Sequence, residues 1–326
     1  MPAIGVIPIG FESLGVRSMC TFVETPDVRV LIDAGVALGF RFGKLPHPRE
    51  YRARNKCRAK IREFAAKADV IVVSHYHNDH HTPNYTETVY VGSSLEESEQ
   101  VYQDKIVLLK DIRNAINFSQ RRRGWMFQRF VKRIGGKCEI ADGKTFEYGA
   151  TQVRVSQPVP HGEEESELGW VVMTTIESRD DKLLHASDVQ GPMAKGTARM
   201  ILTESPDLLI LGGPPVYLEG AKVDKAVIRK GIDNAVRITA KVPKTLFEHH
   251  LLRSEDWRDR AKPVYDSGRK AGHAVTTAAE YAGETLQVLE AIRPQLYEEE
   301  PPSEAFLKWS MMKREKQRSQ WPPIDS

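Results

Sequence analysis

The segment VIVVSHYHNDHH, residues 70–81, decides the fold of this chain. Its first four residues are apolar and β-branched, which predicts a short buried strand. Strong metal ligands follow at once, namely His75, His77, Asp79 and His80. Side chains two residues apart on an extended segment share a face, so His75 and His77 are expected to point to the same side. Nitrogen and carboxylate ligands together suit zinc or a similar divalent ion.

The alternative interpretation is a surface loop that merely happens to be rich in histidine. The chain has ten histidines, and four of them lie at positions 75, 77, 80 and 81. This clustering directly after a strand favours a metal-ligand motif, which further ligands elsewhere in the chain must complete.

The run His-x-His-x-Asp-His after a hydrophobic strand resembles the signature of the metallo-β-lactamase superfamily of binuclear metallohydrolases. The resemblance implies an α+β fold, a four-layer αββα sandwich, and covers about residues 1–290 by motif order. We therefore predict a catalytic domain over residues 1–293. Residues 294–326 are expected to form a C-terminal tail or docking arm, partly disordered. The whole chain most resembles poorly characterised archaeal members of the superfamily.

The resemblance also assigns the metal ligands. They are His75, His77 and His161 on one metal, Asp79, His80 and His249 (or His250) on the other, and Asp188 between the two. Asp188 suits a bridging position because a carboxylate offers two oxygens. His249 is preferred to His250, because Arg253 then follows at the distance found in the tRNA-processing nuclease branch.

The implied cofactors are two divalent metal ions, zinc foremost, with iron and manganese as alternatives. Two such ions lower the pKa of a bridging water, and the resulting hydroxide attacks phosphorus or an acyl carbon. Asp79 is expected to orient this hydroxide as well as to bind metal. Asp33, which ends a predicted strand, is expected to support the metal loop by hydrogen bonding rather than serve as a plain turn residue. His77 stands where the oxygen-reducing di-iron branch carries Glu, which disfavours an oxidoreductase.

These features predict a metal-dependent hydrolase. The foremost interpretation is a phosphodiesterase acting on a small molecule or a nucleic acid, with promiscuity expected because one hydroxide serves both kinds of centre. The alternative is an acyl hydrolase of the lactonase, thioesterase or β-lactamase type. A third class is a metal-binding regulatory protein without turnover.

One strongly basic segment, residues 105–137, carries ten Lys or Arg and a single acid, Asp111. Apolar residues at three- and four-residue spacing, Ile106, Leu109, Ile112 and Ile116, predict a long helix within a basic helical insertion at about 94–136. Interleaved aromatics make the segment a candidate for binding phosphates and bases, with Arg121, Arg122, Arg123 and Trp125 as the substrate-binding candidates. The bland alternative, a solvated basic helix whose aromatics pack on the core, is the more common case.

Composition restricts the class and the compartment. Hydrophobic residues make up 40% of the chain and charged residues 28%, as in ordinary globular proteins. No apolar run is long enough for a membrane span, and no signal peptide is expected. Three scattered cysteines without a Cys-x-x-Cys pair fit a reducing cytoplasm.

Two further expectations concern surfaces. The loop GFRFG, residues 39–43, is predicted to be either a substrate lid or an ordinary surface loop, because it follows a site residue closely. Trp309 and Trp321 are expected to be exposed in the tail, which makes a homodimer an expectation.

Overall fold

The apolar run at residues 70–73 forms β4 (Val70–Val73), a fully buried strand inside a six-stranded sheet. The computed structural model of the chain describes residues 3–165 and 167–324. The first sheet has the order β1 (Gly5–Gly10), β2 (Cys20–Glu24), β3 (Arg29–Ile32), β4, β5 (Ile106–Leu109) and β6 (Lys137–Ile140). Its first three strands are antiparallel, whereas β3 to β6 run parallel.

A second sheet of seven strands packs against the first. Its order is β15 (Ala274–Thr276), β14 (Lys244–Glu248), β13 (Leu208–Gly212), β12 (Asp181–His185), β11 (Thr174–Ser178), β8 (Thr151–Val155) and β7 (Thr145–Tyr148). The strands β12 to β15 are parallel and the others antiparallel. A short ribbon of β9 (Val159–Pro160) and β10 (Trp170–Val171) stands apart.

Alternation along the strands separates the layers. Val70 and Val72 belong to the core between the sheets, whereas Ile71 and Val73 belong to the core on the outer face of the first sheet. That outer core also takes residues from α1 (Pro48–Lys67), α2 (Leu95–Tyr102) and α3 (Phe118–Arg133). The outer core of the second sheet takes residues from α4 (Lys195–Glu204), α5 (Lys225–Thr239) and α6 (Trp257–Ala271).

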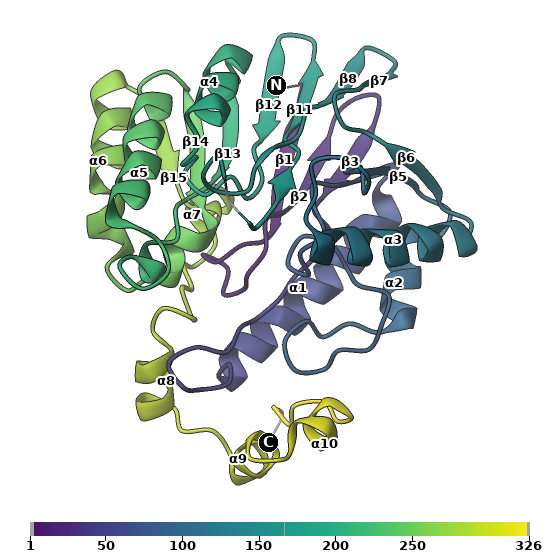
Figure 1. Ribbon diagram of the computed structural model, residues 1–326, viewed down its shortest axis with the longest axis vertical. Helices are drawn as coiled ribbons and strands as arrows, with labels where there is room; N and C mark the ends of the chain where they lie inside the picture. The colour runs from purple at the N-terminus through teal and green to yellow at the C-terminus, as the bar shows by residue number, and fades with distance from the viewer. Residues whose placement is uncertain (1–2, 166, 325–326) are drawn as a thin grey trace.

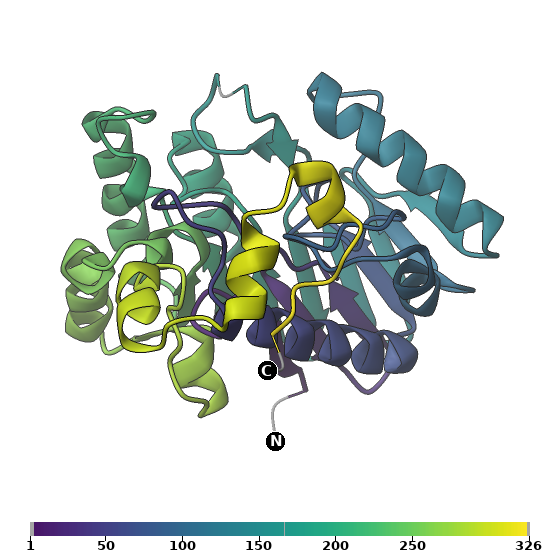
Figure 2. The same ribbon diagram turned by 90° about the horizontal axis from the view of Figure 1, so that it is seen from below.

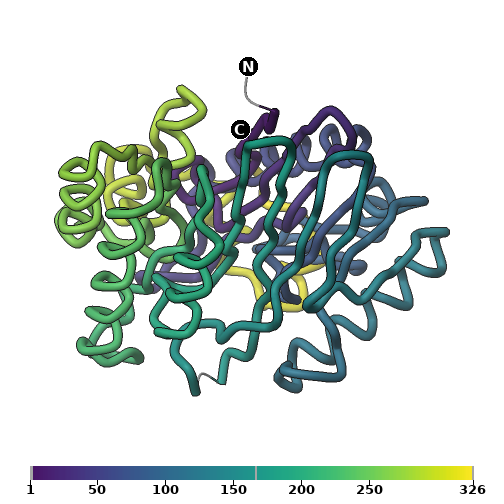
Figure 3. Tube along the Cα trace, turned by 90° about the horizontal axis from the view of Figure 1, so that it is seen from above, coloured from purple at the N-terminus to yellow at the C-terminus, as the bar shows by residue number. Residues whose placement is uncertain are grey.

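Three cores between four layers are an αββα sandwich, so the predicted fold class is confirmed. Figures 1 and 3 show the two groups of helices on opposite sides of the strands. In the described part of the chain, no helix is both long and apolar enough to cross a bilayer.

Parallel pairing places the functional loops at one edge of the sandwich. Because β3 and β4 are parallel, Asp33 and Ser74 leave the sheet at the same end. The strands β12, β13 and β14 are also parallel, so the segments that follow them lie at one edge of the sheet. These segments are residues 186–190, 213–217 and 249–253. The segments that follow β3, β4, β12 and β14, which hold predicted site residues, therefore lie close together at this edge.

The prediction of a long helix beginning near residue 106 is wrong. Ile106–Leu109 is β5, which pairs in parallel with both β4 and β6. A strand buried on both faces is a continuous apolar run, which periodicity alone does not distinguish from a buried helical segment. The basic helix α3 starts only at Phe118, where the Asn117 side chain accepts a hydrogen bond from the Gln120 N–H and caps it.

The C-terminal residues are part of the fold. After α7 (Ala278–Ala282), the helices α8 (Arg293–Glu299), α9 (Glu304–Ser310) and α10 (Arg314–Arg318) cross the lower face of the molecule (Figure 2). Phe306 and Trp309 join the outer core of the first sheet and pack on Tyr51 of α1. Trp309 is only 1% exposed, so the expectation that it lies on the surface is wrong, whereas Trp321 is 53% exposed as expected.

Replacing Trp309 by alanine is expected to lower the free energy of unfolding by about 3–5 kcal/mol, because it leaves a large cavity against Tyr51. Urea unfolding followed by circular dichroism measures this loss. Trp321→Ala is the matched control, and a change within about 0.5 kcal/mol is expected for that exposed residue. Equal losses of unfolding free energy for the two substitutions would contradict the packing of Trp309 against Tyr51.

A buried ion pair fastens the segment before α8 to the loop after β1. The Arg17 guanidinium donates two hydrogen bonds of 2.6 Å to the Glu290 carboxylate. Burial alone would raise the pKa of Glu290, but the Arg17 charge and hydrogen bonds lower it to about 2. An unfolded Glu titrates near about 4.3, so the unfolded chain binds more protons between these values.

The stabilisation by this pair is therefore complete above about pH 5 and is lost as pH falls toward 2. The total is of the order of 3 kcal/mol. We expect Glu290→Gln to be less stable than the parent protein at neutral pH, with the difference shrinking by about 2 kcal/mol between pH 5 and pH 3. Urea unfolding at both pH values measures it. The exposed Glu299→Gln is the control, and a constant difference for Glu290→Gln would refute the assignment.

Candidate metal centre

A first cluster of donors consists of His75, His77, His161 and Asp188, whose ligand atoms all lie within 4.8 Å of one another. The two histidines of the motif follow β4, His161 follows β9, and Asp188 follows β12. Nε2 of His75 lies 3.2 Å from Nδ1 of His77, and Nε2 of His161 lies 2.7 Å from Oδ2 of Asp188. The structure thus brings together the four residues predicted for the first ion.

A second cluster consists of Asp79, His80 and His249, again with ligand atoms within 4.8 Å. Oδ2 of Asp188 lies 3.2 Å from Nε2 of His249. Asp188 therefore contacts a histidine of each cluster, which is the position that a bridging carboxylate needs. All seven predicted ligands converge on one place.

His249 and His250 both approach the same carboxylate. Nε2 of His250 lies 3.1 Å from Oδ2 of Asp188, but only His249 is grouped with Asp79 and His80. The backbone of His249 is left-handed, with φ of 65°, a costly conformation for a residue with a side chain. The geometry favours His249 as the donor of the second cluster. His250, whose Nδ1 lies 3.1 Å from the Tyr217 hydroxyl, is an eighth donor at its rim.

Hydrogen bonds around Asp33 orient two of the histidines. The Ser74 hydroxyl donates to Oδ2 of Asp33 at 2.7 Å, so the Ser74 oxygen must accept the 2.9 Å bond from Nδ1–H of His75. Nδ1–H of His80 donates to the same Asp33 carboxylate at 2.8 Å. Both rings are therefore held in the tautomer that leaves Nε2 free as a ligand.

Asp33 also accepts hydrogen bonds from the Ser74 N–H at 2.8 Å and from the Ser187 hydroxyl at 3.0 Å. Burial would raise its pKa, but His80 and these donors hold the pKa of Asp33 below its usual value. The contacts are those predicted for a supporting residue. Gly35 lets the two loops meet, since a Cβ there would lie 2.2 Å from the backbone nitrogen of His81.

Glu12 plays the same part for the second cluster. It is buried, and its carboxylate accepts Nδ1–H of His249 at 3.1 Å and Nε–H of Arg253 at 2.8 Å. The Arg253 guanidinium in turn lies 3.7 Å from Oδ2 of Asp79. The sequence gives no signal for Glu12, which follows β1 and meets His249 across 237 residues of chain.

The electrostatic environment suits cations. Burial and then the charges of neighbouring histidines lower the pKa of His75 well below its usual value, which keeps the lone pair on Nε2 available. Burial opposes ionisation of Asp188, but His250, His161 and His249 hold its pKa well below the usual range. Burial would lower the pKa of His249, yet Glu12 and Asp188 raise it to about 10. The carboxylates that favour a proton on His249 also favour a metal cation there.

The donor set fits two divalent ions. Ligand atoms about 2.0–2.1 Å from a tetrahedral zinc ion lie roughly 3.3 Å apart. In the first cluster, Nε2 of His75 and Nδ1 of His77 are 3.2 Å apart, and in the second, Nε2 of His249 and Oδ2 of Asp79 are 3.9 Å apart. Two donors, Nε2 of His80 and Oδ1 of Asp188, are buried and lack a hydrogen-bond partner in the described residues. Buried polar atoms without a partner are costly, and a metal ion would give these two atoms one. The identity of the metal stays a prediction.

The basic helix α3 contributes one arginine to this place. Arg123 is partly buried, its Nε has no hydrogen-bond partner among the described residues, and its charge acts on Asp79 and His77. Arg121, Arg122 and Trp125 are exposed instead. Of the four predicted substrate-binding residues, Arg123 alone is partly buried, and the roles of all four stay predictions.

The loop of residues 39–43 borders the second cluster. The Arg41 guanidinium lies 4.5 Å from the ring centre of Tyr217, which contacts His250, and it donates a hydrogen bond to the Arg253 carbonyl. Phe40 and Phe42 are exposed. A lid over the site stays a prediction that this position favours.

No family profile matches the chain. Among solved structures, it is similar to the metallo-beta-lactamase fold protein YhfI from Bacillus subtilis, with 16% identity and a TM-score of 0.49 over 84% of this chain and 95% of that one. The short form of human tRNase Z is 11% identical with a TM-score of 0.41, over 75% and 92% of the two chains.

Similarity in sequence is much higher to a set of archaeal proteins. The chain is 41% identical over 296 residues to a UPF0282 protein of Methanopyrus kandleri, which covers 90% of this chain and 99% of that protein. It is 38% identical over 304 residues to a UPF0282 protein of Korarchaeum cryptofilum, with 93% and 97% covered. With its αββα layers and its converged ligands, the chain has the metallo-β-lactamase fold and belongs to the UPF0282 family.

Proposed function

We propose that this protein is a metal-dependent hydrolase of phosphodiester bonds. The observation that carries the proposal is the pair of donor clusters joined by Asp188. Arg123, whose charge acts on His77 and whose buried Nε has no hydrogen-bond partner among the described residues, supports it. Two divalent ions in such a site supply Lewis acidity and a nucleophilic hydroxide near neutral pH.

The residues of the chain have distinct tasks in this proposal. His75, His77 and His161 would hold one ion, and His80 and His249 would hold the other. Asp79 is 18% exposed, and its pKa is held below the usual range by His80, His249 and Arg253 although burial opposes this. An ionised carboxylate at this place accepts a hydrogen bond from the attacking water and so orients it.

Arg123 supports a phosphodiester over an acyl substrate. A phosphodiester carries a negative charge, and an arginine guanidinium matches phosphate oxygens in both charge and geometry. Lactones and β-lactam amides have no such charge at the bond to be cleaved. Among the described residues Arg123 forms no ion pair with an acid, so its charge is available to a phosphate.

The test is a panel of a chromogenic phosphodiester, a lactone, a thioester and a β-lactam. Each is assayed after chelation and after addition of zinc, manganese or iron. We expect metal-restored turnover of the phosphodiester, and Arg123→Ala should raise its KM about ten-fold, as loss of a charged hydrogen bond does. Arg133→Ala, exposed at the C-terminal end of the same helix and outside the predicted substrate-binding set, is the matched control.

His77→Ala controls for contaminating activity. Metal-dependent turnover of acyl substrates alone would replace the proposal by the acyl hydrolase alternative. Bound metal with no turnover of any substrate would instead point to the regulatory protein.

A further inference from the structure

A cavity of about 630 Å³ opens beside the metal-ligand loop. Asn78, which stands between His77 and Asp79 in the chain, forms part of its wall. Another part of the wall comes from the C-terminal helix α10, through Arg314 and Arg318. Figure 2 shows the C-terminal segment that includes this helix, in yellow, on the face seen from below. The tail therefore contributes directly to the surroundings of the site.

Arg314 and Arg318 are exposed at the cavity, and neither forms an ion pair among the residues that the structure describes. The one acid in the described cavity wall is Glu87. Its carboxylate accepts hydrogen bonds from the backbone N–H groups of Val89, Tyr90 and Val91. Two cations close together repel each other, so the wall gains stability when an anion lies between them.

Aromatic rings border the same cavity. Phe40 is 59% exposed and Tyr85 is 40% exposed, although apolar rings of this size are usually buried. Exposed rings next to unpaired arginines are the pattern by which proteins hold single-stranded nucleic acid, with bases stacked on the rings and phosphates paired with the cations.

We infer that this cavity is a binding site for single-stranded nucleic acid, with a base stacked on Phe40 or Tyr85 and a phosphate paired with Arg314 and Arg318. The inference rests on the proposed function, since it places a nucleotide neighbouring the cleaved bond next to Asn78. A cavity of 630 Å³ lies within the range of ordinary ligand pockets.

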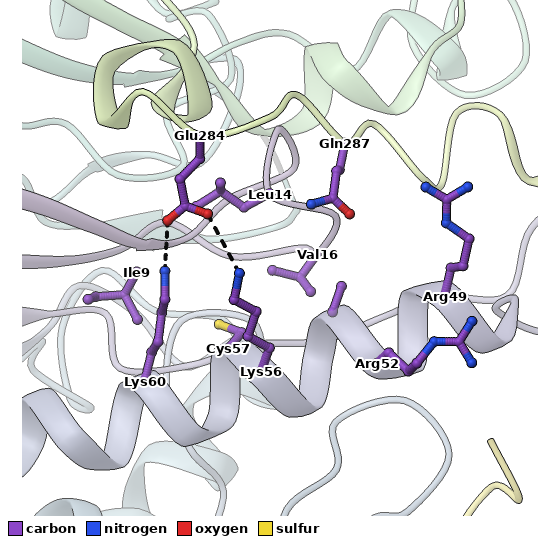
Figure 4. Close-up of a pocket in the computed structure, with 11 residues that line it drawn as sticks. Ile9, Leu14, Val16, Arg49, Arg52, Lys56, Cys57, Lys60, Glu284 and Gln287 are labelled. Atoms are coloured by element: carbon purple, nitrogen blue, oxygen red, sulfur yellow. Dashed lines mark hydrogen bonds and ion pairs between the residues drawn. The ribbon is translucent and has the colours of Figure 1, made fainter. Parts of the chain in front are cut away.

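A second cavity shows by contrast what makes this site distinct. It holds about 220 Å³ between α1 and the segment around Glu284, and several cations line it (Figure 4). There the Glu284 carboxylate lies 2.9 Å from Lys60 Nζ and 3.8 Å from Lys56 Nζ, so both lysines share an acidic partner. Its rim residue Arg52 therefore supplies a control cation away from the proposed site.

The test is fluorescence anisotropy of a labelled 12-nucleotide RNA with the full-length protein, repeated at several salt concentrations. Chelated protein is used, so that binding is measured without cleavage. The double variant Arg314→Ala/Arg318→Ala should raise Kd at least ten-fold and make the salt dependence shallower by about 0.7 for each phosphate that the variant no longer binds. Phe40→Ala should raise Kd roughly ten-fold with the salt dependence unchanged.

Lys316→Ala, on the same helix but outside the cavity wall, and Arg52→Ala are the matched controls, each expected to change Kd less than two-fold. If the double variant binds RNA like these controls, the inference is wrong, whatever the protein hydrolyses. If the double variant loses binding while no phosphodiester is cleaved after metal addition, the nucleic-acid site stands and the proposed activity falls. Thermal unfolding of each variant verifies that weaker binding does not come from misfolding, and Phe40→Ala provides an independent readout if the double variant is unstable.

Discussion

Asp188→Ala is expected to reduce phosphodiester turnover at least roughly 10³-fold. Substitution of a residue that only supports a metal ligand typically costs less, about 10–100-fold. Its Oδ2 lies within 3.2 Å of Nε2 of His161, His249 and His250, and its Oδ1 is buried without a partner among the described residues. Removing the carboxylate leaves these histidines facing one another without a shared anion.

Metal content should fall with activity. Inductively coupled plasma mass spectrometry of the purified protein should find about two ions per chain in the parent and at most one in Asp188→Ala, as the two-metal arrangement requires. Asp180→Ala, at the exposed turn between β11 and β12, is the matched control. Two tightly bound ions and normal turnover in Asp188→Ala would show that Asp188 does not bridge.

Asp33→Ala is expected to act on both stability and metal affinity. The substitution leaves four donors without their acceptor, namely Nδ1–H of His80, the Ser74 N–H, and the hydroxyls of Ser74 and Ser187. Breaking such a buried charged network costs about 3–5 kcal/mol of unfolding free energy. Metal affinity should fall about 10–100-fold, because the His80 and His75 rings lose their fixed orientation.

Two measurements separate these effects. Urea unfolding in the presence of chelator gives the stability of the metal-free protein, and competition with a chromogenic chelator gives the metal affinity. Asp33→Asn, which keeps one oxygen for the Ser74 N–H, is expected to lie between alanine and the parent in both. Unchanged metal affinity in a folded Asp33→Ala protein would show that Asp33 is a turn residue only.

Most of the metal centre could be predicted because its donors lie at positions defined by strands. A buried run ending at Val73 fixes where His75 and His77 emerge, and the side-chain period of two gives their common direction. The resemblance supplied the rest of the donors, and parallel pairing of β12 and β14 with the strand between them made them meet. Between His249 and His250 the sequence offers no distinction, since adjacent residues differ only in the backbone angles that aim them.

What the sequence by itself determined is the buried strand at residues 70–73 and the donors His75, His77, Asp79 and His80 that follow it, because these lie in one local pattern of a few residues. The layered α+β architecture and the remaining donors came from the resemblance that this pattern carries. What only the tertiary structure decided are the contacts between distant segments. Glu12 accepts a hydrogen bond from His249, Arg123 rather than Arg121 is partly buried, and Trp309 is buried against Tyr51. Local periodicity describes which face of an element is apolar, but not which distant element will cover it. Which distant elements contact each other depends on how the layers pack, so these contacts could be identified only from the tertiary structure.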